Sequence, residues 1–379
     1  NTEESGVKVE DYGIYTQVEQ LNKTALKSHG LDSNGQLYKI NSFEFYRYED
    51  IIKKEDDAGY DKTAFEKMLE IKGDSDHTKL IDMLTDLNDY SIGIEDVLKE
   101  HFDEENIVYW MAFQILMGNV DTQNRNVYLY SPLNSDIWYF IAWDNDGCLM
   151  RPEYELRNFS DQNSWEKGIS NYWGNILFQR CLKSRSFREK LNDAILDLRE
   201  YLNKDMLTSK IESYKNVLKP YLYLMPDAEY EPLTSEQYDQ IAASLPDEIE
   251  KNYQLYLESL ETPMPFYIGV PTIDGDKLKF NWDVSYDLDA EDITYSVEVA
   301  GDYLFRDVIY QNTTLTVPEA EMDLPNAGQY FVRVRATNTS GKTQDAFDYY
   351  VTDEGKHYGM KCFYITEDNT VEEDIYEEG

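Results

Sequence analysis

The spacing of hydrophobic residues in this 379-residue chain changes near Thr262-Pro263-Met264-Pro265. Before this point apolar residues recur mainly at helical spacing, and after it they alternate in short runs that are typical of strands. Because helices and strands require different periods, the change predicts two structurally different regions in one chain. The length, at roughly 150 residues per domain, also favours two or three domains.

The region before residue 262 predicts many helices and a few strands. Residues 9–20 alternate like a half-buried strand, and Asn22 is suited to cap a short helix that stops at Gly30. The helix predicted over 104–117 is apolar almost all round, so we expect it to be buried, and Gly118 is placed to end it. Strands are predicted over 127–130 and 137–143, with a polar loop over 152–170. Further helices are predicted over 65–71, 80–87, 173–182, 187–202, 206–218 and 235–260, the last interrupted at Leu245-Pro246.

The charge balance excludes several classes of function. The chain has 35 basic and 74 acidic side chains, a formal net charge of −39. Nucleic-acid binding needs a surplus of Lys and Arg, so we expect no nucleic-acid partner. The sequence has no apolar run of about 18 residues, so no transmembrane segment is predicted. The three cysteines and four histidines are scattered and form no metal-binding pattern. Chemistry in this chain would therefore rest on carboxylates.

Polar residues follow the helix over 104–117 and the strand that ends at Trp143. Asp121 and Asn126 lie in the segment between that helix and the first strand, and Asp144 and Asp146 follow the second strand. A hairpin would bring these segments together into one cleft. Carboxylates and an amide oxygen are hard ligands that suit Mg²⁺ or Mn²⁺. Asp121 and Asn126 also suit a simple polar turn, but the five-residue spacing between them is that of the protein-kinase catalytic loop.

At these positions the sequence resembles the spore coat protein H (CotH) kinase-like family. The resemblance spans roughly residues 11–260, and its motifs are Tyr12-Gly13-Ile14-Tyr15-Thr16-Gln17-Val18-Glu19-Gln20, Leu37-Tyr38-Lys39, Gly118-Asn119-Val120-Asp121, Asn126-Val127-Tyr128-Leu129-Tyr130, Trp138 and Trp143-Asp144-Asn145-Asp146. It implies an α+β atypical protein-kinase-like fold that binds ATP with Mg²⁺ or Mn²⁺. It also implies phosphorylation of Ser or Thr in secreted, coat or cell-surface proteins.

The resemblance also implies roles for individual residues. Asp121 would be the catalytic-loop aspartate, oriented toward the acceptor hydroxyl or the metal. Asn126 would be a metal ligand, Asp144 the principal Mg²⁺ ligand and Asp146 a second metal contact. The backbone of Glu19 would face adenine. The chain departs from ordinary kinases, because Asn119-Val120 replaces His-Arg and Asn145-Asp146 replaces Phe-Gly.

The region after residue 262 resembles a fibronectin type III-like domain. Strand patterns at 278–282, 295–299 and 330–336, with Trp282 in the first, predict an immunoglobulin-like or fibronectin III-like all-β sandwich. We therefore expect a kinase-like domain over residues 1–262 and a sandwich over residues 263–352. Residues 353–379 would form an acidic C-terminal tail, in which 360–365 could add one strand and 367–379 would be a solvated end.

Two functional hypotheses remain open at this level. No Gly-rich phosphate loop and no strand Lys with a helix Glu partner precede Asp11, so we expect the N-terminal lobe of the kinase-like domain to be largely missing. The first hypothesis is a phosphotransferase, and whether it is active without that lobe is left open at this level. The second is an extracellular surface-binding or adhesion module built on a degenerate kinase-like fold. On either hypothesis we expect a bacterial protein that is exported or held at the cell surface.

Overall fold

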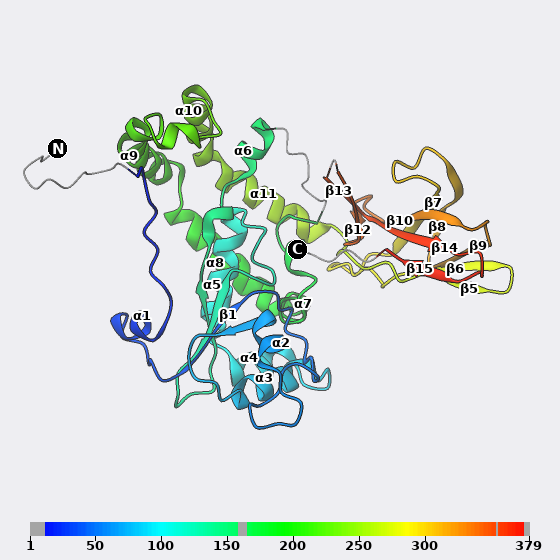
Figure 1. Cartoon of the computed structure of the whole chain (residues 1–379), viewed down its shortest axis with the longest axis horizontal. Helices are drawn as coiled ribbons and strands as arrows, with labels where there is room; N and C mark the ends of the chain where they lie inside the picture. The colour runs from blue at the N-terminus through cyan, green and yellow to red at the C-terminus, as the bar shows by residue number, and fades with distance from the viewer. Residues whose placement is uncertain (1–11, 158–164, 354, 375–379) are drawn as a thin grey trace, which may run out of the picture.

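The computed structural model describes residues 12–157, 165–353 and 355–374. A mainly helical region is followed by a β-rich region, and the two lie side by side (Figure 1). The last helix of the first region ends at Glu261, immediately before the predicted change of pattern. Among the described residues, no helix is long and apolar enough to cross a membrane.

A four-stranded antiparallel sheet lies in the helical region. Its strand order is β2-β1-β3-β4, and its strands are β1 (Gln36–Ile40), β2 (Leu69–Ile71), β3 (Val127–Ser131) and β4 (Tyr139–Ala142). One face contributes Tyr38, Leu129 and Phe140 to the main hydrophobic core. The other face packs Tyr128 and Tyr130 against α1 (Lys23–Ser28). The sheet is therefore covered by the main core on one face and only in part by α1 on the other, where Ile141 and Trp143 remain half-buried.

Helix α5 (Glu104–Met117) is the centre of the helical region. It is buried on most sides and contacts α8, α11 and β4. Such a helix needs apolar residues all round, which is the pattern of its sequence. Asp103 caps its start through the Asn106 amide, and Gly118 ends it in the left-handed conformation. The other helices are α2 (Lys62–Met68), α3 (Thr78–Asn88), α4 (Ile94–His101), α6 (Arg151–Leu156), α7 (Ile176–Lys183), α8 (Arg185–Tyr201), α9 (Lys204–Leu222), α10 (Ser235–Ser244) and α11 (Glu248–Glu261).

The β-rich region contains two larger antiparallel sheets, ordered β5-β6-β9 and β15-β14-β10-β7-β8, with β11 on β10 and a separate β12–β13 hairpin. The two larger sheets share one core that contains Phe280, Val297, Val334 and Phe363. The strands are β5 (Thr272–Asp274), β6 (Lys277–Asn281), β7 (Ile293–Ala300), β8 (Val308–Leu315), β9 (Glu319–Asp323), β10 (Gly328–Asn338), β11 (Thr343–Asp345), β12 (Tyr349–Thr352), β13 (Gly355–Tyr358), β14 (Met360–Ile365) and β15 (Val371–Glu373).

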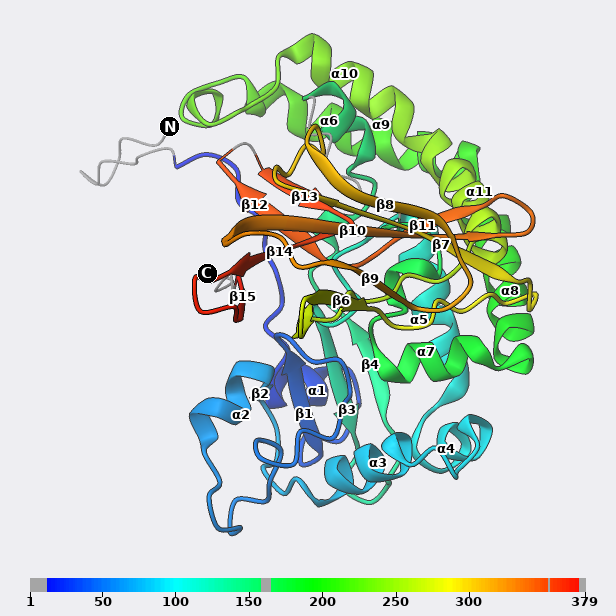
Figure 2. The ribbon, with the colours of Figure 1, turned by 90° about the vertical axis from the view of Figure 1, so that its right-hand side faces the viewer.

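Aromatic contacts join the two regions, which overlap in the view of Figure 2. The Trp165 ring meets the Phe347 ring edge-on at 5.1 Å between centroids and lies 6.2 Å from the Tyr358 ring. The Trp173 ring lies 5.4 Å from the Tyr286 ring. Trp165 and Trp173 flank the short segment that leads into α7, so the β-rich region supports that segment.

Several predictions of local structure are wrong. Within the expected strand over 9–20, residues 12–20 form no strand, because no neighbouring strand pairs with them; the earlier part lies outside the described residues. Leu69 and Ile71 leave the predicted helix to pair with β1 as β2. Helix α6 begins at Arg151 and occupies the start of the predicted polar loop over 152–170. In contrast, the additional strand expected at 360–365 forms as β14 and pairs with β10. Val371–Glu373 pair with β14, so this part of the expected solvated end is a strand.

Candidate functional site

The β3–β4 hairpin brings two polar loops to one end of the sheet. Val127 pairs with Ala142, so the loop before β3 and the loop after β4 leave the hairpin side by side. In the first loop, the Asn126 side chain donates from Nδ2 to Asp121 Oδ2 at 2.7 Å and to the Asp121 carbonyl at 3.2 Å. Asp144 begins the second loop and precedes a short 3₁₀ turn that contains Asp146.

Three amide side chains connect these loops. The buried Asn119 donates to Gln114 Oε1 at 3.1 Å, and Gln114 donates to Asn145 Oδ1 at 3.1 Å. A longer contact of 3.5 Å joins Asn119 Nδ2 to the same Asn145 oxygen. The Asp121 backbone N–H donates to Asn119 Oδ1 at 3.3 Å. Asn119 and Asn145, together with Gln114, therefore hold the two loops together.

Three residues in and next to these loops have a left-handed backbone conformation. Asn126 has φ 58°, Asp144 has φ 54° and Leu149 has φ 59°. Asn and Asp tolerate this conformation better than other residues with a Cβ atom, whereas Leu adopts it at a cost. Such strain persists only where surrounding contacts impose it, and it is frequent at functional sites.

The Asp121 carboxylate is the electrostatic focus of the site. Its side chain is 53% exposed, yet partial burial raises its pKa, and the charges of Asp146 and Asp144 raise the pKa further. Arg125 and the Asn126 amide act in the opposite direction, since both stabilise the ionised form. The Arg125 Nε atom lies 3.5 Å from Asp121 Oδ1. Asp121 is thus close enough to Asp144 and Asp146 to sense their charges.

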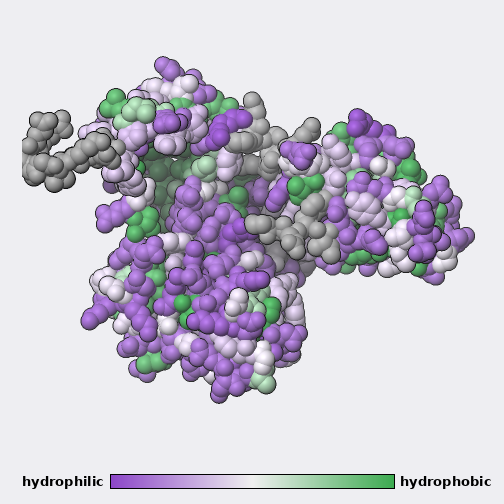
Figure 3. All heavy atoms as spheres, viewed as in Figure 1, coloured by the Kyte–Doolittle hydropathy of each residue, from purple (hydrophilic) through white to green (hydrophobic). Residues whose placement is uncertain are grey.

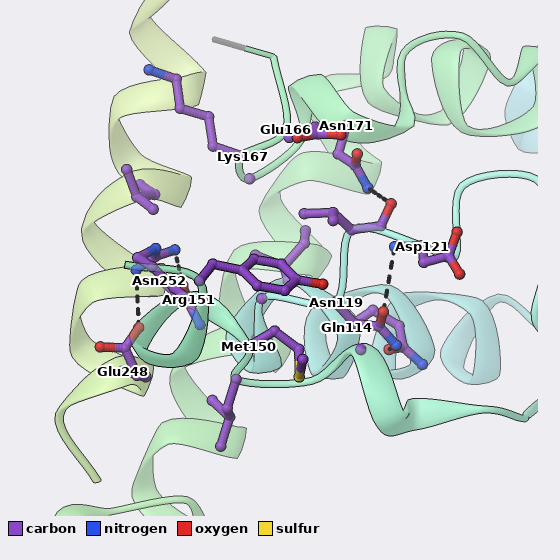
Figure 4. Close-up of a pocket in the computed structure, with 18 of the residues that line it drawn as sticks. Gln114, Asn119, Asp121, Met150, Arg151, Glu166, Lys167, Asn171, Glu248 and Asn252 are labelled. Carbon is purple, nitrogen blue, oxygen red and sulfur yellow. Dashed lines mark hydrogen bonds and ion pairs between the residues drawn. The ribbon is translucent and has the colours of Figure 1, made fainter. Parts of the chain in front are cut away.

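A pocket of about 580 Å³ lies beside Asp121 (Figure 4). The helical region is hollowed between its α9–α10 end and its lower part (Figure 3). Asp121 and Asp146 line the pocket, whereas Asn126 and Asp144 are not among its lining residues. Its wall combines apolar and charged side chains from α5, the segment before α6, α6 itself, α11 and the segment before α7: Ile115, Leu149, Met150, Arg151, Tyr154, Glu166, Lys167, Asn171, Glu248 and Leu255.

Residues distant in sequence support the Asp121 loop. Asn171 Nδ2 donates to the Val120 carbonyl at 3.1 Å, and Asn175 Nδ2 donates to the Gln123 carbonyl at 2.8 Å. The Tyr172 hydroxyl lies 3.1 Å from the Thr122 hydroxyl. The sequence pattern did not identify these supports.

A buried ion pair forms the opposite wall of the pocket. Arg151 Nη1 lies 3.1 Å from Glu248 Oε2, and Arg151 Nη2 donates to Asn252 Oδ1 at 2.6 Å. Asn252 in turn donates to the Leu116 carbonyl at 2.9 Å, near the end of α5. This network joins the segment after the Asp144 loop to α11 and to the helix that precedes Asp121 (Figure 4).

The structure brings four of the five predicted site residues together. Asp121, Asn126, Asp144 and Asp146 lie in the two adjoining loops. Glu19 lies elsewhere, in the extended segment before α1, where its carboxylate contacts the His29 ring at 2.7 Å and the Ser28 hydroxyl at 3.3 Å. Within residues 12–157, 165–353 and 355–374, no group of three or more His, Cys, Asp or Glu side chains is placed to hold one metal ion.

The fold and the site define a helical α+β protein in which a β-hairpin presents paired acidic loops beside a pocket. Comparison with known families is consistent with that description, because residues 4–256 match the model of the CotH kinase protein family. This match covers most of the chain, which therefore belongs to the CotH kinase protein family. A search of curated proteins finds no match.

Proposed function

We propose that this chain is an atypical protein-kinase-like phosphotransferase. It would use ATP with Mg²⁺ or Mn²⁺ to phosphorylate Ser or Thr in secreted, coat or cell-surface proteins of a bacterium, and it would itself be exported. The observation that carries the proposal is the junction of the two loops, where Asn119 and Asn145 hold the Asp121 loop against the Asp144 loop. Family membership supports a kinase-like activity.

The proposed roles follow from the donor atoms in the two loops. Asp144 and Asn126 would hold a divalent cation, and Asp146 would supply a second contact. Mg²⁺ commonly takes one or two carboxylates from a protein and its other ligands from phosphate and water, so this oxygen donor set fits the ion. Asp121, at the pocket rim, would orient the acceptor hydroxyl and accept its proton. The bound cation would neutralise phosphate charge and so permit an acidic protein to bind ATP.

The proposed fold assignment extends to both regions. The order α5, Asp121 loop, β3, β4 and Asp144 loop supports a kinase-like C-terminal lobe. The sheet face that carries the half-buried Ile141 and Trp143 offers an apolar surface for adenine next to Asp144, and the backbone near Glu19 would complete it. The two sheets around Phe280 and Val334 support a fibronectin III-like sandwich.

The test compares nucleotide use by matched variants of the protein. Protein is incubated with labelled ATP and Mn²⁺, and with Mg²⁺ in parallel, as wild type, Asp144→Ala and Asp276→Ala. Asp276 is an exposed residue of the β5–β6 turn, so Asp276→Ala controls for loss of an acidic group. We expect labelling of a Ser/Thr peptide library by wild type and Asp276→Ala and not by Asp144→Ala. Equal labelling by all three would refute the site assignment.

A second candidate function is an extracellular binding module. Exposed apolar side chains follow helical spacing on α9 and continue beyond it: Tyr214 is 63% exposed, Tyr221 58% and Met225 68%. Clusters of this kind favour an interaction surface. If neither ATP nor ADP raises the melting temperature in the presence of Mn²⁺, and no labelling occurs, the binding function is favoured over the kinase.

A further inference from the structure

The proposed transfer of a phosphoryl group needs positive charge that the acidic loops lack. Asp121, Asp144 and Asp146 are all acidic, and the chain as a whole carries −39. In phosphoryl transfer, catalysis consists largely of positioning and of neutralising charge on the transferred group. A positively charged side chain next to Asp121 would therefore favour the transfer by neutralising this charge.

The two basic residues that line the pocket are committed to other partners. Arg151 pairs with the fully buried Glu248 at 3.1 Å. Lys167 lies 3.3 Å from Glu258, and the Lys167 side chain is only 19% exposed. A phosphate group could recruit either residue only by breaking an existing ion pair.

Arg125 is not among the lining residues of the pocket but neighbours Asp121, and its side chain is held differently. Its Nε atom is 3.5 Å from Asp121 Oδ1, and the side chain is 41% exposed. This Nε atom is buried and has no hydrogen-bond partner in the described part of the chain. The contact with Asp121 is therefore a loose ion pair and not a hydrogen bond. By comparison, the exposed Arg185–Glu189 pair, with the same four-residue spacing, has a contact of 2.8 Å.

The backbone on either side of Arg125 is firmly held. The Asn124 side chain donates to Glu44 Oε1 at 2.6 Å, and the Asn124 carbonyl accepts from the Phe43 N–H at 2.8 Å. Asn126 is bonded to Asp121 through two contacts. A fixed backbone with a loosely paired guanidinium is well suited to pre-position a cation for an incoming anion.

We propose that Arg125 is a catalytic residue that contacts the γ-phosphoryl group of ATP; this inference rests on the proposed function. Its planar guanidinium would bind two phosphoryl oxygens. Asp121 would accept the proton of the acceptor hydroxyl as the bond from the acceptor oxygen to the γ-phosphorus forms. The bond between that phosphorus and the bridging oxygen would break, which leaves ADP and a phosphomonoester. Arg125 would remain protonated throughout and would offset the charge on the transferred group.

The test separates contact with the γ-phosphate from general support of the loop. Affinities for ADP and for a non-hydrolysable ATP analogue are measured with Mn²⁺ by calorimetry for wild type, Arg125→Met, Arg125→Lys and Arg185→Met. We expect Arg125→Met to weaken binding of the analogue about tenfold or more and to change ADP binding little, since ADP lacks the contacted group. Arg125→Lys should recover part of the loss, and Arg185→Met should resemble wild type. Where wild type labels peptides, kcat of Arg125→Met should fall by about 100-fold or more.

Each other outcome has a defined meaning. Equal weakening of ADP and analogue binding by Arg125→Met would overturn the proposal in favour of a structural role, and circular dichroism would report any loss of folding. Unchanged binding and unchanged kcat in Arg125→Met would overturn it directly. A wild-type protein that binds neither nucleotide with Mn²⁺ would overturn the proposed function and the role of Arg125 with it. Wild-type binding with an unaffected Arg125→Met would overturn only the role of Arg125.

Discussion

The Arg151–Glu248 ion pair should make a measurable contribution to the stability of the helical region. The Glu248 side chain is fully buried, whereas the Arg151 side chain is 17% exposed. Glu248 Oε1 also accepts from Lys251 Nζ at 2.6 Å, and Arg151 also donates to Asn252 at 2.6 Å. The two members of the pair therefore have different alternative partners, so their single substitutions should differ.

The expected loss of stability depends on which partners remain for the residue that is not substituted. Breaking a buried ion pair by removing one partner costs about 3–5 kcal/mol. Glu248→Ala leaves Arg151 with its Asn252 contact and some access to water, so we expect the low end, about 3 kcal/mol. Arg151→Met leaves the fully buried Glu248 carboxylate with the Lys251 contact and no access to water, so we expect a larger loss, about 4 kcal/mol. At about 2–4 °C per kcal/mol for a region of this size, the melting temperature should fall by about 6–12 °C for Glu248→Ala.

The assay is a double-mutant cycle with urea unfolding followed by circular dichroism at pH 7.5. The double variant should be more stable than the sum of the single effects predicts, by about 1.5 kcal/mol, because the second substitution removes a charge that has already lost its partner. The exposed Arg185–Glu189 pair, with side chains 85% and 63% exposed, provides the control, and its coupling should be below about 0.5 kcal/mol. Additive single effects at Arg151 and Glu248 would refute the reasoning.

Three further predictions concern pH, backbone strain and the contact between regions. Burial lowers the pKa of His77. This residue therefore contributes stability above the unfolded pKa of about 6.5, and that stability is lost as pH falls. The melting temperature should decline more below pH 6.5 in wild type than in His77→Gln, and parallel curves of melting temperature against pH would contradict this. Gly118 has φ +61°, and an added Cβ would lie 2.7 Å from a side-chain amide of α11, whereas Gly30 has φ +73° with nothing within 4 Å. Urea unfolding should therefore show a greater loss of unfolding free energy for Gly118→Ala than for Gly30→Ala, which should lose only about 1–2 kcal/mol. Equal losses would exclude the steric effect. The edge-on contact of Trp165 with Phe347 should give a coupling of about 0.5–1.5 kcal/mol in a cycle of alanine variants, and zero coupling would show that the rings do not stabilise each other.

Local signals predicted the central elements of the helical region. Helix α5 was predicted with its bounds because its apolar residues, its acidic first turn and Gly118 all act within one helix. The β3–β4 hairpin followed from two β-prone runs separated by a turn. In contrast, the alternating residues 12–20 form no strand, since an alternating pattern does not supply a partner. The partner of β14 is β10, a pairing that no local signal specifies.

The candidate site likewise contains residues that the sequence could identify and residues that it could not. The residue types of Asp121, Asn126 and Asp144, and the hairpin between their loops, could be identified from the sequence. The amides of Asn171 and Asn175 could not, because they reach the Asp121 loop across about fifty residues of chain. A side chain that donates to a backbone carbonyl places no constraint on the residue type of its partner, so the sequence carries little trace of the pairing.

The sequence by itself therefore determined the change from helical to β structure near residue 262, the ends of the central helix and the chemical character of the two acidic loops. These properties depend on residues that are neighbours along the chain or within one turn or hairpin. Only the tertiary structure decided that Glu248 and Asn252 meet Arg151 and that Trp165 rests on the β-rich region. Those contacts arise when distant elements pack together, and packing selects partners by shape and by the need to satisfy buried polar groups.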